Sequence, residues 1–236
     1  MTVQMDQRYG ASPKMVAEFF DVELDEFMNW MYLPVRWNTG PLDDVRLPYN
    51  LLPIAEMVRA VLDDLDGAPG QYVYVTGKHN FATPGNPLNR GGWHCDGFGT
   101  DDLNYVWWAG AGTRFLICNY GIDDRIPADH IGSLDAFEKL AEEAESGRGG
   151  MKVGTRPQRT LYKIDRWVIH ATPEIPEPGE MRSWVKVSVS PNRYNLMGNA
   201  HNDKFEYRWR MWPRSTIRND PSRAQADFYQ PDGAAT

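Results

Sequence analysis

A histidine and an aspartate stand one residue apart in the segment GGWHCDGFG, residues 91–99. Imidazole nitrogens and carboxylate oxygens are both strong ligands for divalent transition metals. A third candidate, His170, follows in the apolar segment RWVIHAT. Two imidazoles and one carboxylate on one side of a metal form the ligand set of non-haem Fe(II) oxygenases, which leaves coordination positions open. The sequence therefore predicts a metal site at His94, Asp96 and His170.

Glycines flank the His-x-Asp pair on both sides and fit such a site. Without a Cβ, glycine lets backbone and ligands approach closely and leaves space beside a metal. We therefore expect open coordination positions between these four residues: Gly91, Gly92, Gly97 and Gly99.

Several segments with strand character must bring the three ligands together. QYVYVTGKH and MRSWVKVSVSP alternate with period two, with valines on one face and larger or polar residues on the other. TRFLICNY is apolar enough for a buried strand, and RTLYKIDRWVIHAT predicts two strands or one bent strand. In order, the predicted strands cover residues 71–79, 113–120, 159–165, 166–172 and 181–191.

Helices are predicted mainly in the first third of the chain. Ser12 and Pro13 are typical of a helix start, and apolar residues recur after them at roughly helical spacing until Pro34. A second helix is predicted over residues 51–65. A third, over residues 133–147, begins with Ser133 as its cap and forms a surface insertion.

Twelve positions after His170, an arginine begins the last predicted strand. The set WHCD at 93–96, His170 in WVIHATPE and Arg182 in RSWVKVSVS resembles the Fe(II)/2-oxoglutarate-dependent dioxygenase superfamily. The resemblance implies that His94, Asp96 and His170 bind iron and that Arg182 binds the distal carboxylate of 2-oxoglutarate. A guanidinium suits this role because its fork pairs with a carboxylate through two charge-assisted hydrogen bonds.

The same resemblance implies an α+β fold with a double-stranded β-helix core, also called a jelly roll and cupin-like. We expect a single domain over residues 1–236, with helical support at 1–68, the core at about 70–191 and a C-terminal extension at 192–236. The implied reaction uses Fe(II), 2-oxoglutarate and O2. It hydroxylates a C–H bond of a small molecule and releases succinate and CO2.

The sequence departs from the family pattern two residues after Arg182. Many members have serine or threonine there, whereas this chain has Trp184. Tyr74 is the residue we expect to help hold the cosubstrate, with Lys78 and Ser188 as substitutes. Lys186 is a rival to Arg182 as the anchor.

The residues leave alternatives open. One is the same chemistry on a nucleobase or nucleotide, with Trp107 and Trp108 as stacking surfaces and the basic, aromatic segment 204–218 as a contact. A packed return of that segment over the core is the competing prediction. A different class is a cupin-like protein that binds metal or ligand without redox turnover. A zinc hydrolase is disfavoured, since the chain has no HExxH motif.

Composition excludes other classes. The net charge of −7 argues against tight binding of the whole chain to a nucleic-acid backbone. No run of about 18 apolar residues predicts a membrane span, and MTVQMDQRYG does not resemble a signal peptide. Two cysteines are too few for a disulfide framework, which favours a reducing, cytoplasmic location. The sequence leaves substrate identity and oligomeric state undetermined.

Overall fold

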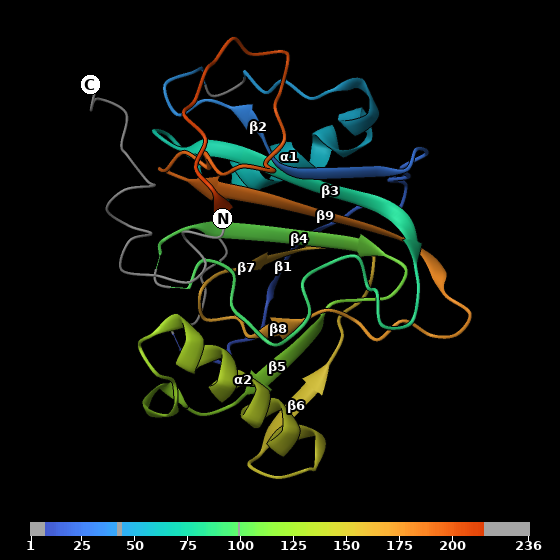
Figure 1. Cartoon of the computed structure of the whole chain (residues 1–236), viewed down its shortest axis with the longest axis vertical. Helices are drawn as coiled ribbons and strands as arrows, with labels where there is room; N and C mark the ends of the chain where they lie inside the picture. The colour runs from blue at the N-terminus through green and yellow to red at the C-terminus, as the bar shows by residue number, and fades with distance from the viewer. Residues whose placement is uncertain (1–7, 42–43, 99, 215–236) are drawn as a thin grey trace.

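The computed structural model describes residues 8–41, 44–98 and 100–214, which form mostly antiparallel β-structure with few helices (Figure 1). Within these residues, no helix has the length and apolar character needed to cross a membrane. In chain order the elements are β1 (Lys14–Glu18), β2 (Met28–Arg36), η1 (Tyr49–Ile54), α1 (Ala55–Asp64), β3 (Tyr72–Ala82), β4 (Leu103–Ala109), β5 (Arg114–Cys118), η2 (Asp123–Arg125), α2 (His130–Glu145), β6 (Met151–Gly154), β7 (Thr160–Ile164), β8 (His170–Ala171) and β9 (Glu180–Ser190).

The strands form two sheets. The large sheet has the order β1-β7-β4-β9-β3-β2, and the small sheet has the order β6-β5-β8. All strand pairs are antiparallel. An isolated bridge between His94 and His170 extends the small sheet by one position beyond β8. The chain therefore passes repeatedly from one sheet to the other.

Each sheet is covered by a helix on its outer face (Figure 1). On the large sheet, the valines of β3 and β9 pack with α1 in one cluster, as alternation predicted. On the small sheet, Leu116 and Ile169 pack against α2. Between the sheets lies a third cluster that includes Val106, Trp108, Phe115 and Val168. His170 follows Ile169, so alternation turns its side chain toward this space between the sheets.

A buried ion pair fixes α1 to the large sheet. Lys163 of β7 donates from Nζ to Asp64 Oδ2 at 2.7 Å, and both side chains are 4% exposed. Tyr105 of β4 donates its hydroxyl to the same oxygen at 2.6 Å. The end of α1 is thus tied to two strands through one carboxylate.

The predicted helix after Pro13 is wrong, because this region forms β1 and β2. β1 pairs with β7, and β2 pairs with β3. The apolar spacing that indicated a helix is not a pattern of burial: Met15, Phe20 and Phe27 are 60%, 58% and 72% exposed. Pairing with strands far along the chain decides the structure here, and local periodicity does not report it.

The other predicted elements are present with shifted ends, but the strand predicted at 166–172 is reduced to the two residues of β8. The predicted helix at 51–65 corresponds to η1 and α1. The helix predicted at 133–147 begins earlier, at His130, because Asp129 caps it by accepting a hydrogen bond from the Gly132 amide at 2.7 Å. Ser133 is instead buried inside the helix. The strands β4 and β6 were not predicted.

The C-terminal segment up to Arg214 packs back over β2, as one of the two predictions had it. Asn202 donates from Nδ2 to the carbonyls of Pro34 and Arg46, at 2.8 and 2.9 Å. Phe205 is buried and contacts the Trp37 ring at a centroid distance of 5.3 Å. Residues 215–218 of the predicted segment lie outside the described residues.

Candidate metal centre

His94 and His170 face each other across an antiparallel bridge. Each residue donates its backbone N–H to the other's carbonyl, in both cases at 2.9 Å. Directly opposed residues in an antiparallel pair have side chains on the same face. The two imidazole rings accordingly lie side by side, with centroids 4.5 Å apart.

The outer nitrogen of each ring is held by a backbone carbonyl two residues earlier. His94 Nδ1 lies 2.9 Å from the Gly92 oxygen, and His170 Nδ1 lies 3.0 Å from the Val168 oxygen. A carbonyl can only accept, so each Nδ1 carries the proton and each Nε2 keeps a lone pair. This arrangement orients metal-binding histidines in known sites.

Asp96 completes the group. Candidate ligand atoms of His94, Asp96 and His170 all lie within 4.8 Å of one another, and this group could hold a metal ion. Asp96 Oδ2 is 3.8 Å from His170 Nε2. The sequence-predicted convergence of the three residues is therefore present in the structure.

Burial and charge set the protonation states of the three residues. Burial lowers the pKa of His94 to about 4 and also lowers the pKa of His170, so both rings are neutral at neutral pH. Burial by itself would raise the pKa of Asp96. The nearby Lys186 ammonium and the two histidines outweigh it and lower the pKa well below its usual range. Two neutral imidazoles and a carboxylate are the forms that bind a metal.

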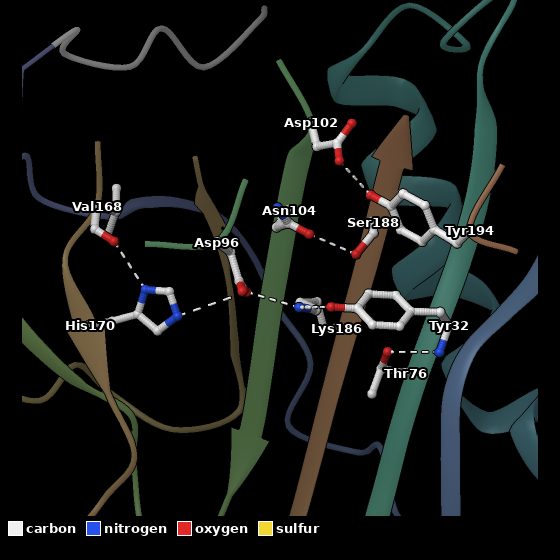
Figure 2. A network of polar contacts seen from close by, with 10 residues as sticks. All are labelled: Tyr32, Thr76, Asp96, Asp102, Asn104, Val168, His170, Lys186, Ser188 and Tyr194. Carbon is white, nitrogen blue, oxygen red and sulfur yellow. Dashed lines mark hydrogen bonds and ion pairs between the residues drawn. The ribbon is translucent and has the colours of Figure 1, made fainter. Parts of the chain in front are cut away.

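The carboxylate is held from the large sheet by Lys186 of β9 (Figure 2). Lys186 Nζ donates to Asp96 Oδ2 at 2.9 Å and to the Tyr32 hydroxyl at 3.2 Å. Tyr32 is a residue of β2 with a φ of 47°, and its amide donates to Thr76 Oγ1 at 3.1 Å. A non-glycine residue with positive φ is strained, and such strain is typical of positions that hold a side chain for function.

The triad opens into a cavity of about 190 Å³ between the sheets. Its wall is rich in cations, with Asp96 as its only carboxylate among the described residues. The lining side chains come from β2, β3, β8 and β9 and from the loops beside them: Met31, Tyr32, Thr76, Lys78, Asn89, Arg90, His94, Asp96, Thr113, His170, Ala171, Thr172, Arg182, Trp184, Lys186 and Arg214. Such a wall attracts anionic ligands.

Arg182 lies on the same cavity wall, buried except for 1% of its surface. Its Nε donates to the Ala111 carbonyl at 2.8 Å, and Nη1 donates to Pro87 O and Asn89 Oδ1 at 3.1 and 3.0 Å. Among the described residues no acceptor contacts Nη2. The guanidinium is thus fixed by the protein, with one nitrogen left for a ligand.

Tyr74 does not line this cavity, so its expected contact with the cosubstrate is corrected. Its hydroxyl donates to the Asn192 carbonyl at 2.8 Å, and its ring stacks on Tyr194 at 4.2 Å. Tyr74 pairs with Ser188, six residues along β9 from Arg182. At about 3.3 Å per residue, the two positions lie roughly 20 Å apart. Tyr74 therefore lies on the same face of the large sheet as Arg182, but too far along the strands to reach the cavity.

Two of the flanking glycines are required where they stand. Gly97 has a φ of +76°, and a Cβ there would lie 3.2 Å from the Asp102 carbonyl. Gly92 has a φ of +85°, and a Cβ there would lie 3.2 Å from Glu138 Oε1 of α2. The same glutamate accepts the Trp93 amide at 3.0 Å. The helix predicted as a surface insertion thus anchors the loop that carries two ligands.

Trp107 and Trp108 are not stacking surfaces. Both are fully buried in β4, Trp107 under α1 and Trp108 between the sheets. The burial of the two rings was not predicted, because none of the predicted strands covers β4. The alternation of LNYVWWA, with Tyr105 and Trp107 on one face, was a signal of the strand.

Cys95 is a buried, free cysteine that packs under α2. Because it lies outside the group that could hold a metal, we expect Cys95→Ala to retain metal at wild-type stoichiometry. Loss of buried packing should lower the unfolding free energy modestly, by about 1 kcal/mol for the volume of roughly one methyl group. Metal analysis and urea denaturation of the variant test both expectations. Loss of metal from a folded Cys95→Ala protein would make Cys95 part of the site.

Sequence reasoning missed Tyr32 and Asn104. Tyr32 lies in a region that was predicted as helix, and no local pattern places it beside Lys186. Asn104 lies on the unpredicted strand β4. Lys186 was considered, but as a ligand anchor rather than as a partner of Asp96.

The chain was compared with models of known protein families and with curated proteins, and neither comparison gives a match.

Proposed function

We propose that this protein is an Fe(II)- and 2-oxoglutarate-dependent oxygenase that hydroxylates a C–H bond of a small molecule. The observation that carries the proposal is the pairing of two features in one cavity. The first is the His94-Asp96-His170 group, which lines the cavity. The second is the guanidinium of Arg182, which lines the same cavity, is held by backbone contacts and has Nη2 available for a ligand. The first feature suits Fe(II) with open positions, and the second suits a carboxylate.

The order of the strands supports the jelly-roll core that this proposal includes. From β3 onward the chain alternates between the large sheet and the small sheet, with His94 as the small-sheet position between β3 and β4. β5 and β6 are consecutive in the small sheet, after which β7, β8 and β9 alternate again. We therefore propose a double-stranded β-helix as the finer description of the two sheets.

In this proposal, each residue of the site has a separate role. Gly92 and Val168 carbonyls hold the Nδ1 protons of the histidines, so both Nε2 atoms point to one place. Lys186 holds one oxygen of Asp96 and thereby fixes the carboxylate's direction. Arg182 binds the distal carboxylate of 2-oxoglutarate. When bound, the iron and the cosubstrate supply an O2-dependent oxidation that releases succinate and CO2.

Lys186 is a poorer anchor for 2-oxoglutarate than Arg182. Its ammonium already donates two of its three hydrogens, to Asp96 and to Tyr32. It could therefore give a second carboxylate one hydrogen bond, whereas Nη2 of Arg182 could give two. This favours Arg182 of the two anchors that the sequence offered.

Replacing Arg182 with alanine should raise the apparent 2-oxoglutarate constant roughly ten- to hundredfold. The reason is the loss of a charge-assisted contact, which costs about 1.5–3 kcal/mol, at about 1.4 kcal/mol per decade. Succinate formation against 2-oxoglutarate concentration, with Fe(II) and ascorbate, measures it. Arg125→Ala is the matched control, because Arg125 pairs with Glu143 near η2, outside the cavity.

Succinate formation also tests the function itself. The full chain should convert 2-oxoglutarate to succinate in the presence of Fe(II) and O2, at a slow rate when no second substrate is added. A metal-loaded protein that does not bind 2-oxoglutarate would favour the non-redox metal-binding alternative. An unchanged constant in Arg182→Ala, together with a raised constant in Lys186→Ala, would assign the anchor to Lys186.

A further inference from the structure

A second cavity of about 280 Å³ adjoins the metal cavity. The two share five residues, among them the ligand Asp96, Lys186, which donates to it, and Tyr32, which accepts a hydrogen bond from Lys186. The shared wall consists of Tyr32, Arg90, Asp96, Lys186 and Arg214. A molecule in the second cavity would therefore lie beside the ligand Asp96, whereas Arg182 lines only the first cavity.

The charge of the two cavities is opposite in sign to the charge of the chain. The chain has a net charge of −7, yet the described lining contains six Lys and Arg residues: Lys78, Arg90, Arg182, Lys186, Arg193 and Arg214. The lining carboxylates are Asp96 and Asp102. Fe(II) and the 2-oxoglutarate dianion would cancel each other's charge. Arg193 and Arg214 have further interaction partners, but even without them Lys78, Arg90, Arg182 and Lys186 outnumber the two carboxylates after Fe(II) and 2-oxoglutarate have bound. This excess favours a second anionic ligand.

The second carboxylate is itself engaged by the protein. Asp102 accepts hydrogen bonds from the hydroxyls of Ser190, at 2.5 Å, and Tyr194, at 2.8 Å. Each oxygen of the Asp102 carboxylate thus already has a hydrogen-bond donor from the protein.

Two side chains on the wall of the second cavity can donate hydrogen bonds to an anion. Asn104 of β4 is 3% exposed, and its Oδ1 accepts the Ser188 hydroxyl at 2.6 Å (Figure 2). No acceptor among the described residues contacts its Nδ2, so this amide donor is available to a ligand in the cavity that Asn104 lines. Arg90 lies on the loop that carries His94, lines both cavities, and makes no ion pair with any described carboxylate.

We propose that the second cavity binds the anionic end of the substrate, a carboxylate or a phosphate, with Arg90 supplying the charge and Asn104 an amide donor. This proposal rests on the proposed function, because it assigns the substrate class of the same site. Arg90 is then a specificity-determining residue, distinct from the cosubstrate anchor Arg182. A carboxylate and a phosphate share the chemistry that this site recognises.

The test measures binding of phenyl phosphate and benzoate, with neutral benzyl alcohol as the reference, by calorimetry at low ionic strength. The protein is the full chain loaded with Mn(II), with and without saturating 2-oxoglutarate. We expect one or both anions to bind in the presence of 2-oxoglutarate, and benzyl alcohol to bind at least tenfold more weakly. The tighter of the two anions identifies the substrate's charged group.

Arg90→Gln should weaken anion binding roughly ten- to hundredfold and weaken 2-oxoglutarate binding much less. Arg182→Gln should do the opposite. Arg59→Gln, at an exposed arginine of α1, is the matched control and should change neither. Asn104→Ala should also weaken binding of the anion. If the Asn104→Ala protein does not fold, the Arg90→Gln result alone tests the inference.

Equal anion binding by wild type and Arg90→Gln would overturn the inference, as would competition between the anions and 2-oxoglutarate for one place. Failure of the proposed function looks different. In that case 2-oxoglutarate would not bind to the Mn(II)-loaded protein, while Arg90-dependent binding of the anion would persist.

Discussion

Asp96→Ala is expected to lose metal almost completely. An outer partner of a metal ligand contributes roughly ten- to hundredfold to affinity, and removal of a ligand should exceed that. The change also leaves the Lys186 ammonium, which is 6% exposed, without its carboxylate. A cation stranded next to the site opposes binding of a second cation. Anaerobic reconstitution with Fe(II), followed by metal analysis of the desalted protein, measures the loss.

The matched control is Asp101→Ala. Asp101 belongs to the same connection between β3 and β4, but its side chain is 90% exposed and pairs with Arg166. It should keep wild-type metal content. Wild-type stoichiometry in Asp96→Ala would contradict the assignment of Asp96 as a ligand.

Lys163→Met is expected to lower the free energy of unfolding by about 3–5 kcal/mol, the cost of removing one partner of a buried ion pair. The partner is Asp64, whose Oδ2 would lose the ammonium and keep its hydrogen bond from the Tyr105 hydroxyl. Because α1 covers the outer face of the large sheet, the loss should appear in global unfolding. Urea denaturation of the metal-free protein measures it, which separates this effect from metal binding.

The double variant Asp64→Leu/Lys163→Met should recover much of the loss, because it replaces both buried charges of the pair by apolar side chains. Glu56→Gln, which removes an exposed pair with Arg59, should cost at most about 1 kcal/mol. If Lys163→Met is no less stable than Glu56→Gln, the buried pair does not hold α1 to the sheet.

The sequence was informative where local pattern and structure coincide. The valines of β3 and β9 alternate because one face of each strand is buried under α1, so the opposite face could be predicted to carry Arg182 and Lys186. His94 and Asp96, which are close in the sequence, are also close in the structure, because both lie in one short connection near the small sheet.

Sequence reasoning failed where pairing between distant segments decides the outcome. β1 joins the large sheet through β7, about 145 residues later along the chain. No local pattern contains that information, and the apolar residues of the region happen to recur at helical spacing. The same limit applies to Tyr32, whose neighbour Lys186 is 154 positions away.

Tyr74 illustrates a different limit. Alternation gives the face of a strand that a residue occupies, but it does not give the level of that residue relative to the next strand. The register pairs Tyr74 with Ser188 and Asn80 with Arg182. The level of the metal site along β3 is therefore nearer Thr76 and Lys78, which do line the cavity.

Absorption by the anaerobic complex shows whether iron and 2-oxoglutarate are bound at one place, and it needs no substrate. Fe(II) added together with 2-oxoglutarate should give a weak visible charge-transfer band that neither gives alone. The band should be absent from Asp96→Ala and should require a higher 2-oxoglutarate concentration in Arg182→Ala. A wild-type protein that holds Fe(II) but gives no band at saturating 2-oxoglutarate, or a band of full intensity in Asp96→Ala, would contradict the account.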